Sequence, residues 1–216
     1  GGADGKGGFK GIGSSIASLS EEELIKSVED VLCIEAVACK DWLTNKVDRS
    51  VTGLISTQQC CGEIQLPLND VGVTAIGYEN KEGIAVSIGH APAVALIDPA
   101  AGSRISIAEA LTNIIATPIE DGIEGISLSA NWMWPCKNEG ENARLYNAVK
   151  GASDFAISIG VNIPTGKDSM SMTQKYPNGD KVLSPGTLII SATGQSSDVR
   201  KTLHASLVTN EESTIY

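Results

Sequence analysis

The stretch DPAAGSRISIAEALTN (98–113) constrains the fold most, because it predicts where a strand ends and a long helix begins. The apolar run 93–97 before it predicts a strand end, and the small residues that follow predict a turn. Ser106 and Glu109 have the spacing of a capping box, which predicts that the helix starts at Ser106. Glu109 and Asn113, four residues apart, share one helical face. A strand, a small-residue loop and a helix start with oxygen donors can receive a phosphate and its metal ion.

The spacing of apolar residues predicts the elements around this helix. A second long helix is predicted at 141–159, with Gly160 placed to end it. The order strands, helix, strand, helix, strands favours an α+β fold, in which both helices pack on one face of a small mixed sheet. Alternation of apolar and polar residues, or short apolar runs between turn signals, predict strands at 47–56, 68–78, 83–89, 124–130, 169–175 and 186–193, with a hairpin turn at 176–180.

The N-terminal part is predicted to be a linker followed by one helix. Residues 1–19 contain seven glycines. A phosphate-binding loop is rejected there, because Lys6 is followed by glycine rather than Ser or Thr and no strand precedes it. A flexible linker or an expression remnant explains the composition better. Ser20 and Glu23 form a second capping box, which opens a helix within a segment of helix and connection at 20–46.

Composition excludes several classes of function. Hydrophobic residues make up 42% and charged residues 19%, a globular balance, and no apolar run reaches the ~20 residues needed to cross a bilayer. The net charge of −10 opposes binding to a nucleic-acid backbone, and a nucleotide would need a divalent cation such as Mg²⁺ beside it. Five cysteines without a secretion signal indicate reduced thiols in a cytoplasmic protein. Two histidines and no CxxC pair argue against a zinc site.

Three polar clusters are candidates for chemistry. Asn69 and Asp70 stand on a mostly apolar strand, Glu109 and Asn113 share a helical face, and the run 166–169 places a cation, an anion and a hydroxyl after a glycine. Each has a structural alternative, since Asp70 can end a strand, Glu109 can complete the capping box, and the 166–169 run can be a surface turn. Spacing alone predicts no more than a magnesium–phosphate site on an α+β domain.

The histidines and tryptophans carry weaker signals. His90 is a candidate general acid or base, but no orienting partner is near it in sequence, and a loop histidine is the better interpretation. Two histidines do not support a Ser-His-Asp or Cys-His arrangement. Trp132 and Trp134 are predicted to pack at a strand end rather than to stack on a base.

Six segments together resemble a known family, the large purine-pathway phosphoribosylformylglycinamidine synthases. They are similar, in order, to the second of the two tandem aminoimidazole-ribonucleotide-synthetase-like halves of those enzymes. The resemblance covers roughly residues 20–216 and is densest from 46 to 194. The segments are DRSVTG (48–53), QLPLNDVGVTA (65–75), GHAPAVALIDPAAGSRISIAEALTN (89–113), ISLSANWMWP (126–135), ENARLYNAVK (141–150) and IPTGKDSMSM (163–172).

The resemblance implies a fold and a reaction. The fold would be the synthetase N-terminal domain at 47–194, followed at 195–216 by a lead-in to a further domain. The family uses ATP and glutamine to convert formylglycinamide ribonucleotide to its amidine: ATP phosphorylates the amide oxygen, and ammonia from a separate glutaminase domain then displaces the phosphorylated oxygen. That domain carries the cysteine nucleophile, so no cysteine here inherits the role. The fragment alone is expected to be inactive.

The resemblance also implies the site residues. Asp70, Glu109 and Asn113 fall on the magnesium-ligand positions of an auxiliary site that holds a bound ATP or ADP, with an aspartate and a serine supplied from downstream. Asn69 falls on a nucleotide-contact position where the family more often has a small residue. Lys167, Asp168 and Ser169 form a characteristic motif, for which proximity to phosphate is a hypothesis.

Two other interpretations stay open. The chain can be a non-catalytic nucleotide-binding and assembly module, or belong to another ATP-using member of the superfamily. In that superfamily the open sheet face pairs with a homologous domain, so we expect such packing within one chain, or a homodimer of the isolated piece. No nucleic acid and no membrane are expected as partners.

Overall fold

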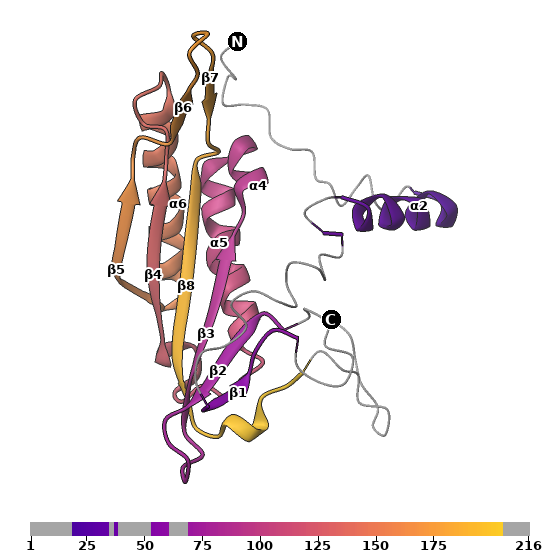
Figure 1. The fold of residues 1–216 in the computed structure, drawn as a ribbon, viewed down its shortest axis with the longest axis vertical. Coiled ribbons are helices and arrows are strands. Elements are labelled where there is room, and N and C mark those ends of the chain that lie inside the picture. Colours follow the sequence, from indigo (N-terminus) through magenta and orange to yellow (C-terminus); the bar gives the residue numbers. More distant parts are fainter. Residues whose placement is uncertain (1–18, 35–36, 39–52, 61–68, 205–216) are drawn as a thin grey trace. The chain divides into compact units, whose positions relative to one another are not determined.

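The structure is a computed structural model that describes residues 19–34, 37–38, 53–60 and 69–204 (Figure 1). The chain divides into two compact units, Gly1–Trp42 and Leu43–Tyr216. In the first unit, helix α2 (Glu21–Leu32) confirms the predicted capping box. The Glu23 N–H donates to Ser20 Oγ at 3.3 Å, and the Ser20 N–H donates to Glu23 Oε2 at 2.8 Å. None of its residues is buried.

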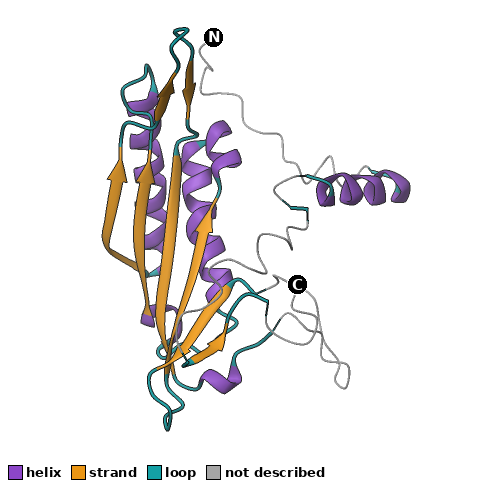
Figure 2. Ribbon diagram, in the orientation of Figure 1, coloured by secondary structure: helices purple, strands orange, loops and turns teal. Residues whose placement is uncertain are grey.

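The second unit confirms the predicted α+β fold. Its six-stranded sheet has the order β1-β2-β3-β8-β4-β5, and only the β4–β5 pair is parallel. Helices α5 (Pro99–Ile114) and α6 (Glu141–Ile159) lie side by side on one face of it (Figure 2). The strands are β1 (Ile55–Thr57), β2 (Val71–Ala75), β3 (Gly83–His90), β4 (Ile126–Met133), β5 (Asn162–Ser169) and β8 (Thr187–Ser196).

The core lies between the sheet and the two helices. Every second residue of β3 is buried, starting from Gly83, so one face of the strand meets α5 while the other stays open. Small residues on α6 let it pack closely on α5; a Cβ on Gly151 would lie 2.8 Å from the Ala100 Cβ. The largest fully buried apolar side chains are Ile107, Ile114, Leu128, Leu188, Ile190 and Trp134.

The predicted start of the central helix at Ser106 is wrong. The run 93–97 belongs to a short helix, α4 (Pro92–Ile97), and α5 begins at Pro99. Asp98 is the N-cap: its Oδ1 accepts the N–H groups of the second and third helical residues, at 2.9 and 3.0 Å. Proline at the first position is preorganised for a helix. Ser106 is buried in mid-helix and donates its hydroxyl to the carbonyl of Gly102 at 2.9 Å.

The predicted strand at 169–175 begins earlier and breaks. Residues 162–169 form β5, so the 166–169 run is part of a strand rather than a glycine turn. Gly166 serves the close pairing with β4, because a Cβ there would lie 2.1 Å from the Ala130 carbonyl oxygen. Beyond β5, the predicted hairpin is present as β6 (Thr173–Lys175) and β7 (Lys181–Leu183).

The long helix ends at Ile159 with Gly160 in the left-handed conformation, as expected. Short 3-10 helices, η1 (Gly122–Gly125) and η2 (Val199–Lys201), complete the described elements. Residues 1–18, most of the first predicted strand (47–52) and the tail 205–216 lie outside the described residues. Among the described helices, none combines the length and apolarity that spanning a bilayer requires.

Candidate functional site

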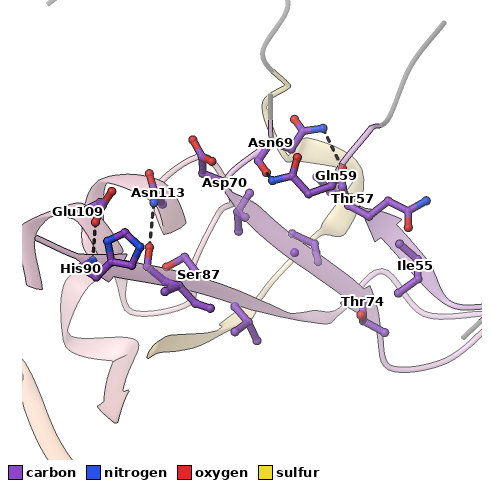
Figure 3. Close-up of a pocket in the computed structure, with 17 residues that line it drawn as sticks. Ile55, Thr57, Gln59, Asn69, Asp70, Thr74, Ser87, His90, Glu109 and Asn113 are labelled. Carbon is purple, nitrogen blue, oxygen red and sulfur yellow. Dashed lines mark hydrogen bonds between the residues drawn. The ribbon is translucent and has the colours of Figure 1, made fainter. Parts of the chain in front are cut away.

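A pocket of about 490 Å³ brings together the four residues that the resemblance assigned to the nucleotide and its metal (Figure 3). They are Asn69, Asp70, Glu109 and Asn113. The pocket lies where β2 begins and antiparallel β3 ends, beside α5. Its volume is within the usual range for small-molecule sites. The fold therefore places residues from three separate elements around one cavity.

Gly89 explains why α5 approaches β3 so closely. A Cβ at this position would lie 2.1 Å from the Ser106 carbonyl oxygen and 2.4 Å from the Ala110 nitrogen, so only glycine fits without movement. Beside this contact, the buried Ser87 hydroxyl donates to the carbonyl of the same Ala110 at 2.6 Å. The helix is thereby fixed to the end of β3, with Glu109 facing the pocket.

Glu109 and Asn113 are each held by the backbone of β3. The His90 N–H donates to Glu109 Oε2 at 2.5 Å, and Asn113 Nδ2 donates to the Ile88 carbonyl at 3.0 Å (Figure 3). Each side chain uses one polar atom for this anchoring. The second carboxylate oxygen of Glu109 and the amide oxygen of Asn113 are left as acceptors beside the pocket. Two oxygen ligands one helical turn apart are thus oriented by the protein itself.

Asp70 completes the polar end of the pocket. Partial desolvation, and secondly the neighbouring Glu109 carboxylate, raise the pKa of Asp70 above its ordinary value, although Asp70 remains an exposed residue. Two carboxylates that repel one another are relieved by a cation between them. Carboxylate and amide oxygens are the hard ligands that Mg²⁺ takes, so the donor set fits this metal.

The protein supplies only part of a coordination shell. Within the described ranges, no group of three His, Cys, Asp or Glu side chains is close enough to hold a metal ion. The candidate set has two carboxylates and one amide, whereas Mg²⁺ needs six ligands. Phosphate oxygens, water or another domain must supply the rest.

Asn69, the residue before Asp70, is hydrogen-bonded to Gln58 and Gln59 in a small amide network. Its Nδ2 donates to the Gln58 carbonyl at 2.9 Å, and its own backbone carbonyl accepts Gln59 Nε2. The network ties the end of β1 to the residue before Asp70. No sequence pattern points to Gln59, because it lies outside any apolar periodicity and its partner Asn69 is ten residues away.

Lys167, Asp168 and Ser169 lie apart from this pocket. They stand on β5, at the opposite edge of the sheet from β1. Lys167 Nζ donates to Ser169 Oγ at 2.9 Å, and Lys167 and Asp168 line a separate pocket of about 340 Å³ beside α6. Within this chain, the two predicted groups do not form a single site.

The other candidates have structural roles. Trp134 is fully buried and Trp132 packs against the core, as predicted. A Cβ on Gly186 would lie 2.3 Å from the Trp134 ring, so that glycine makes room for the indole. His90 is exposed and lines the first pocket, where its backbone N–H, rather than its imidazole, makes the bond to Glu109.

Two relatives of this chain carry the same enzyme name. A protein from Caenorhabditis elegans, "Probable phosphoribosylformylglycinamidine synthase", is 44% identical over 182 residues, which are 84% of this chain and 14% of that protein. The Homo sapiens phosphoribosylformylglycinamidine synthase is 41% identical over 178 residues, 82% of this chain and 13% of that protein. The chain thus spans about one seventh of the length of these relatives.

A solved structure shares the fold. "PurLQS from Thermotoga maritima" aligns with a TM-score of 0.58 at 16% identity, over 78% of this chain and 25% of that one. A family model described as "FGAR-AT PurM_N-like domain" matches residues 39–195, most of the sequence and nearly all of the sheet and its helices. The chain therefore belongs to the FGAR-AT PurM_N-like domain family.

Proposed function

We propose that this chain is the part of a phosphoribosylformylglycinamidine synthase that holds a magnesium-bound ATP or ADP at Asp70, Glu109 and Asn113. The name of its relatives supports the enzyme class. The whole enzyme would be a cytoplasmic, ATP- and glutamine-dependent carbon–nitrogen ligase of purine biosynthesis, converting formylglycinamide ribonucleotide to formylglycinamidine ribonucleotide. This chain alone would be inactive, because it spans about one seventh of the length of the relatives that carry the enzyme's name.

The observation that carries the proposal is the pairing of Asp70 with Glu109 in one pocket, beside Asn113. No lysine or arginine is among the described residues that line this pocket, so a bound divalent cation would relieve the repulsion between the two carboxylates. In an acidic chain, the same cation lets a di- or triphosphate approach. When bound, Mg²⁺ would neutralise phosphate oxygens, while the β3 backbone keeps Glu109 and Asn113 oriented.

A second candidate function is a non-catalytic assembly module, favoured by the uncovered face of the sheet. On β3, Ile84, Val86 and Ile88 point away from the helices and remain 47%, 42% and 54% exposed. A row of exposed apolar side chains along one strand is typical of an interaction face. Val86 and Ile88 also line the pocket, so a homologous domain packing there, within one chain or as a homodimer, would cover this side of it and enclose a nucleotide that is held rather than consumed.

Thermal unfolding of the chain with ADP tests the nucleotide proposal. Mg²⁺ and ADP together should raise Tm, in line with a stabilisation of about 2.7 kcal/mol at a hundredfold excess over Kd. Glu109→Gln should remove most of that shift. The matched control is Glu124→Gln, since Glu124 lies on η1 outside the pocket. Equal stabilisation by ADP in EDTA would contradict a metal-bridged site, and no stabilisation of the wild type would contradict the nucleotide site in this chain.

A further inference from the structure

The Asp70 pocket has a second polar group that the metal proposal does not use. Gln59 lines the same pocket, and its Oε1 is fully shielded from solvent with no hydrogen-bond partner among the described residues. A buried polar atom without a partner costs free energy, and native structures rarely leave one unexplained. This oxygen therefore calls for a donor that the described residues do not provide.

The bonding around Gln59 fixes which of its atoms is available. Its Nε2 donates to the backbone carbonyl of Asn69, so the amide group is held in one orientation with Oε1 as the remaining atom. Asn69 is used in turn, since its carbonyl accepts this bond and its Nδ2 donates to Gln58. In these bonds two amide oxygens, Asn69 Oδ1 and Gln59 Oε1, are not used, and of the two Gln59 Oε1 is the one that is buried without a partner.

The surroundings of Gln59 suit the organic part of a nucleotide. Asn69 directly precedes Asp70, so the amide network adjoins the metal end of the pocket (Figure 3). Apolar side chains from β1 and β3, Ile55 and Val86, line the same cavity. A cavity that combines carboxylates for a metal-bound phosphate with apolar and amide groups suits the sugar and base of a nucleotide as well.

We propose that Gln59 is the residue that selects the nucleoside: a small movement of the atoms that cover its Oε1 exposes this oxygen to the pocket, where it accepts a hydrogen bond from a ribose hydroxyl or from the amino group of the base. This inference rests on the proposed magnesium–nucleotide site and assigns its specificity. Gln59 is a binding residue here and takes no part in chemistry.

The test compares two ligands that share the metal end of the pocket. Isothermal titration calorimetry of the full chain, in Mg²⁺, measures the Kd of ADP and of inorganic pyrophosphate for the wild type and Gln59→Met. Methionine keeps the length of the side chain and removes its amide. ADP binding should weaken by about three- to tenfold, the loss of one neutral hydrogen bond, while pyrophosphate binding stays unchanged. Gln174→Met, on the β6 hairpin outside the pocket, is the matched control and should change neither.

Two analogues then identify the donor. IDP lacks the amino group of adenine, and 2′,3′-dideoxy-ADP lacks the ribose hydroxyls. The analogue without the true donor should bind the wild type as weakly as ADP binds Gln59→Met, and should lose nothing further in that variant. Equal affinity of ADP and both analogues, or equal weakening of ADP and pyrophosphate by Gln59→Met, would overturn the role of Gln59. Failure of pyrophosphate and ADP alike to bind the wild type would instead overturn the magnesium–nucleotide site on which it rests.

Discussion

At the scale of single residues, the candidate site places like charges together. Asp70 is the clearest case, because partial desolvation and Glu109 raise its pKa. A carboxyl whose pKa is higher in the folded state than in the unfolded state binds its proton more tightly when folded. Its contribution to stability is present below the unfolded pKa and is lost as pH rises through the folded pKa. At neutral pH, the metal-free pocket is therefore destabilised by its own carboxylates.

Asp70→Asn separates function from stability. Without metal at pH 7, the variant should unfold at a higher Tm than the wild type, because it removes the repulsion with Glu109. Adding Mg²⁺ and ADP should raise the Tm of the wild type and leave the Tm of the variant unchanged. Thermal unfolding in EDTA and in Mg²⁺–ADP measures both effects. A variant that is less stable than the wild type in EDTA would show that Asp70 serves the fold instead.

Asp198 shows the opposite behaviour at the residue scale. The Arg200 side chain, bound to Asp198 at 2.7 and 2.8 Å, holds the pKa of this carboxyl far below its usual range. Stability from this pair is present above the unfolded pKa of about 4 and is lost as pH falls below it.

Asp198→Asn should therefore lower the urea midpoint at pH 7 and flatten its decline between pH ~5 and ~2.5, relative to the wild type. Urea unfolding across that range measures it. Asp180→Asn, an exposed carboxylate in the β6–β7 hairpin, is the control and should leave the curve unchanged. A parallel decline in wild type and Asp198→Asn would contradict this role.

At the scale of elements, the contact between β3 and α5 determines the site. The bonds that Glu109 and Asn113 make to the backbone of β3 form only if the helix lies against the end of that strand. Gly89 permits that approach, and the Asp98 cap sets where the helix starts.

Gly89→Ala should destabilise the domain by about 1–3 kcal/mol, because its Cβ would overlap the backbone of α5. It should also weaken the response to Mg²⁺ and ADP, because Glu109 and Asn113 shift with the helix. Gly77→Ala, just after β2 and outside the pocket, is the control, since its Cβ would meet nothing closer than 3.8 Å. Urea unfolding measures the stability of both, and similar losses from both would contradict a specific contact at Gly89.

Sequence reasoning predicted the elements better than their boundaries. The helix at 141–159 and the α2 capping box follow from local patterns and are present as expected. The Ser106 prediction failed because Ser-x-x-Glu also occurs inside a helix. The start of α5 depends on the packing of α4 against it, where a Cβ on Gly102 would lie 2.6 Å from the Ala95 Cβ. A local sequence pattern does not show that contact.

The candidate site was accessible from sequence only in part. Helical spacing predicts that Glu109 and Asn113 share a face. Their proximity to Asp70 depends on the order of the strands, and it was predicted only from the resemblance to a family. The separation of Lys167 from that pocket depends on β5 lying at the far edge of the sheet. Gln59 was missed because its partner, Asn69, is reached only through the tertiary fold.

At the scale of the whole molecule, the sheet has one covered and one open face. The helices cover one side, and the opposite side of β3 presents a row of half-exposed apolar side chains. An isolated chain with such a face should self-associate as its concentration rises.

Val86→Lys should abolish this self-association, because a charge would be buried at the centre of the open face. Sedimentation velocity over a concentration series measures it. Ile157→Lys places the same charge at a 76% exposed position on α6 and should have no effect. A wild-type chain that stays monomeric throughout, or a dimer broken equally by both variants, would contradict pairing through this face.

The central claim is that Asp70, Glu109 and Asn113 hold a metal-bound nucleotide. Crystals of the chain grown with Mn²⁺ in place of Mg²⁺, together with ADP, test it most directly through the anomalous scattering of the metal. The predicted result is one Mn²⁺ peak within coordinating distance of the oxygens of these three side chains, contacting the phosphates of ADP. ADP bound without metal in this pocket, or Mn²⁺ with ADP beside Lys167 and Asp168 instead, would contradict the claim.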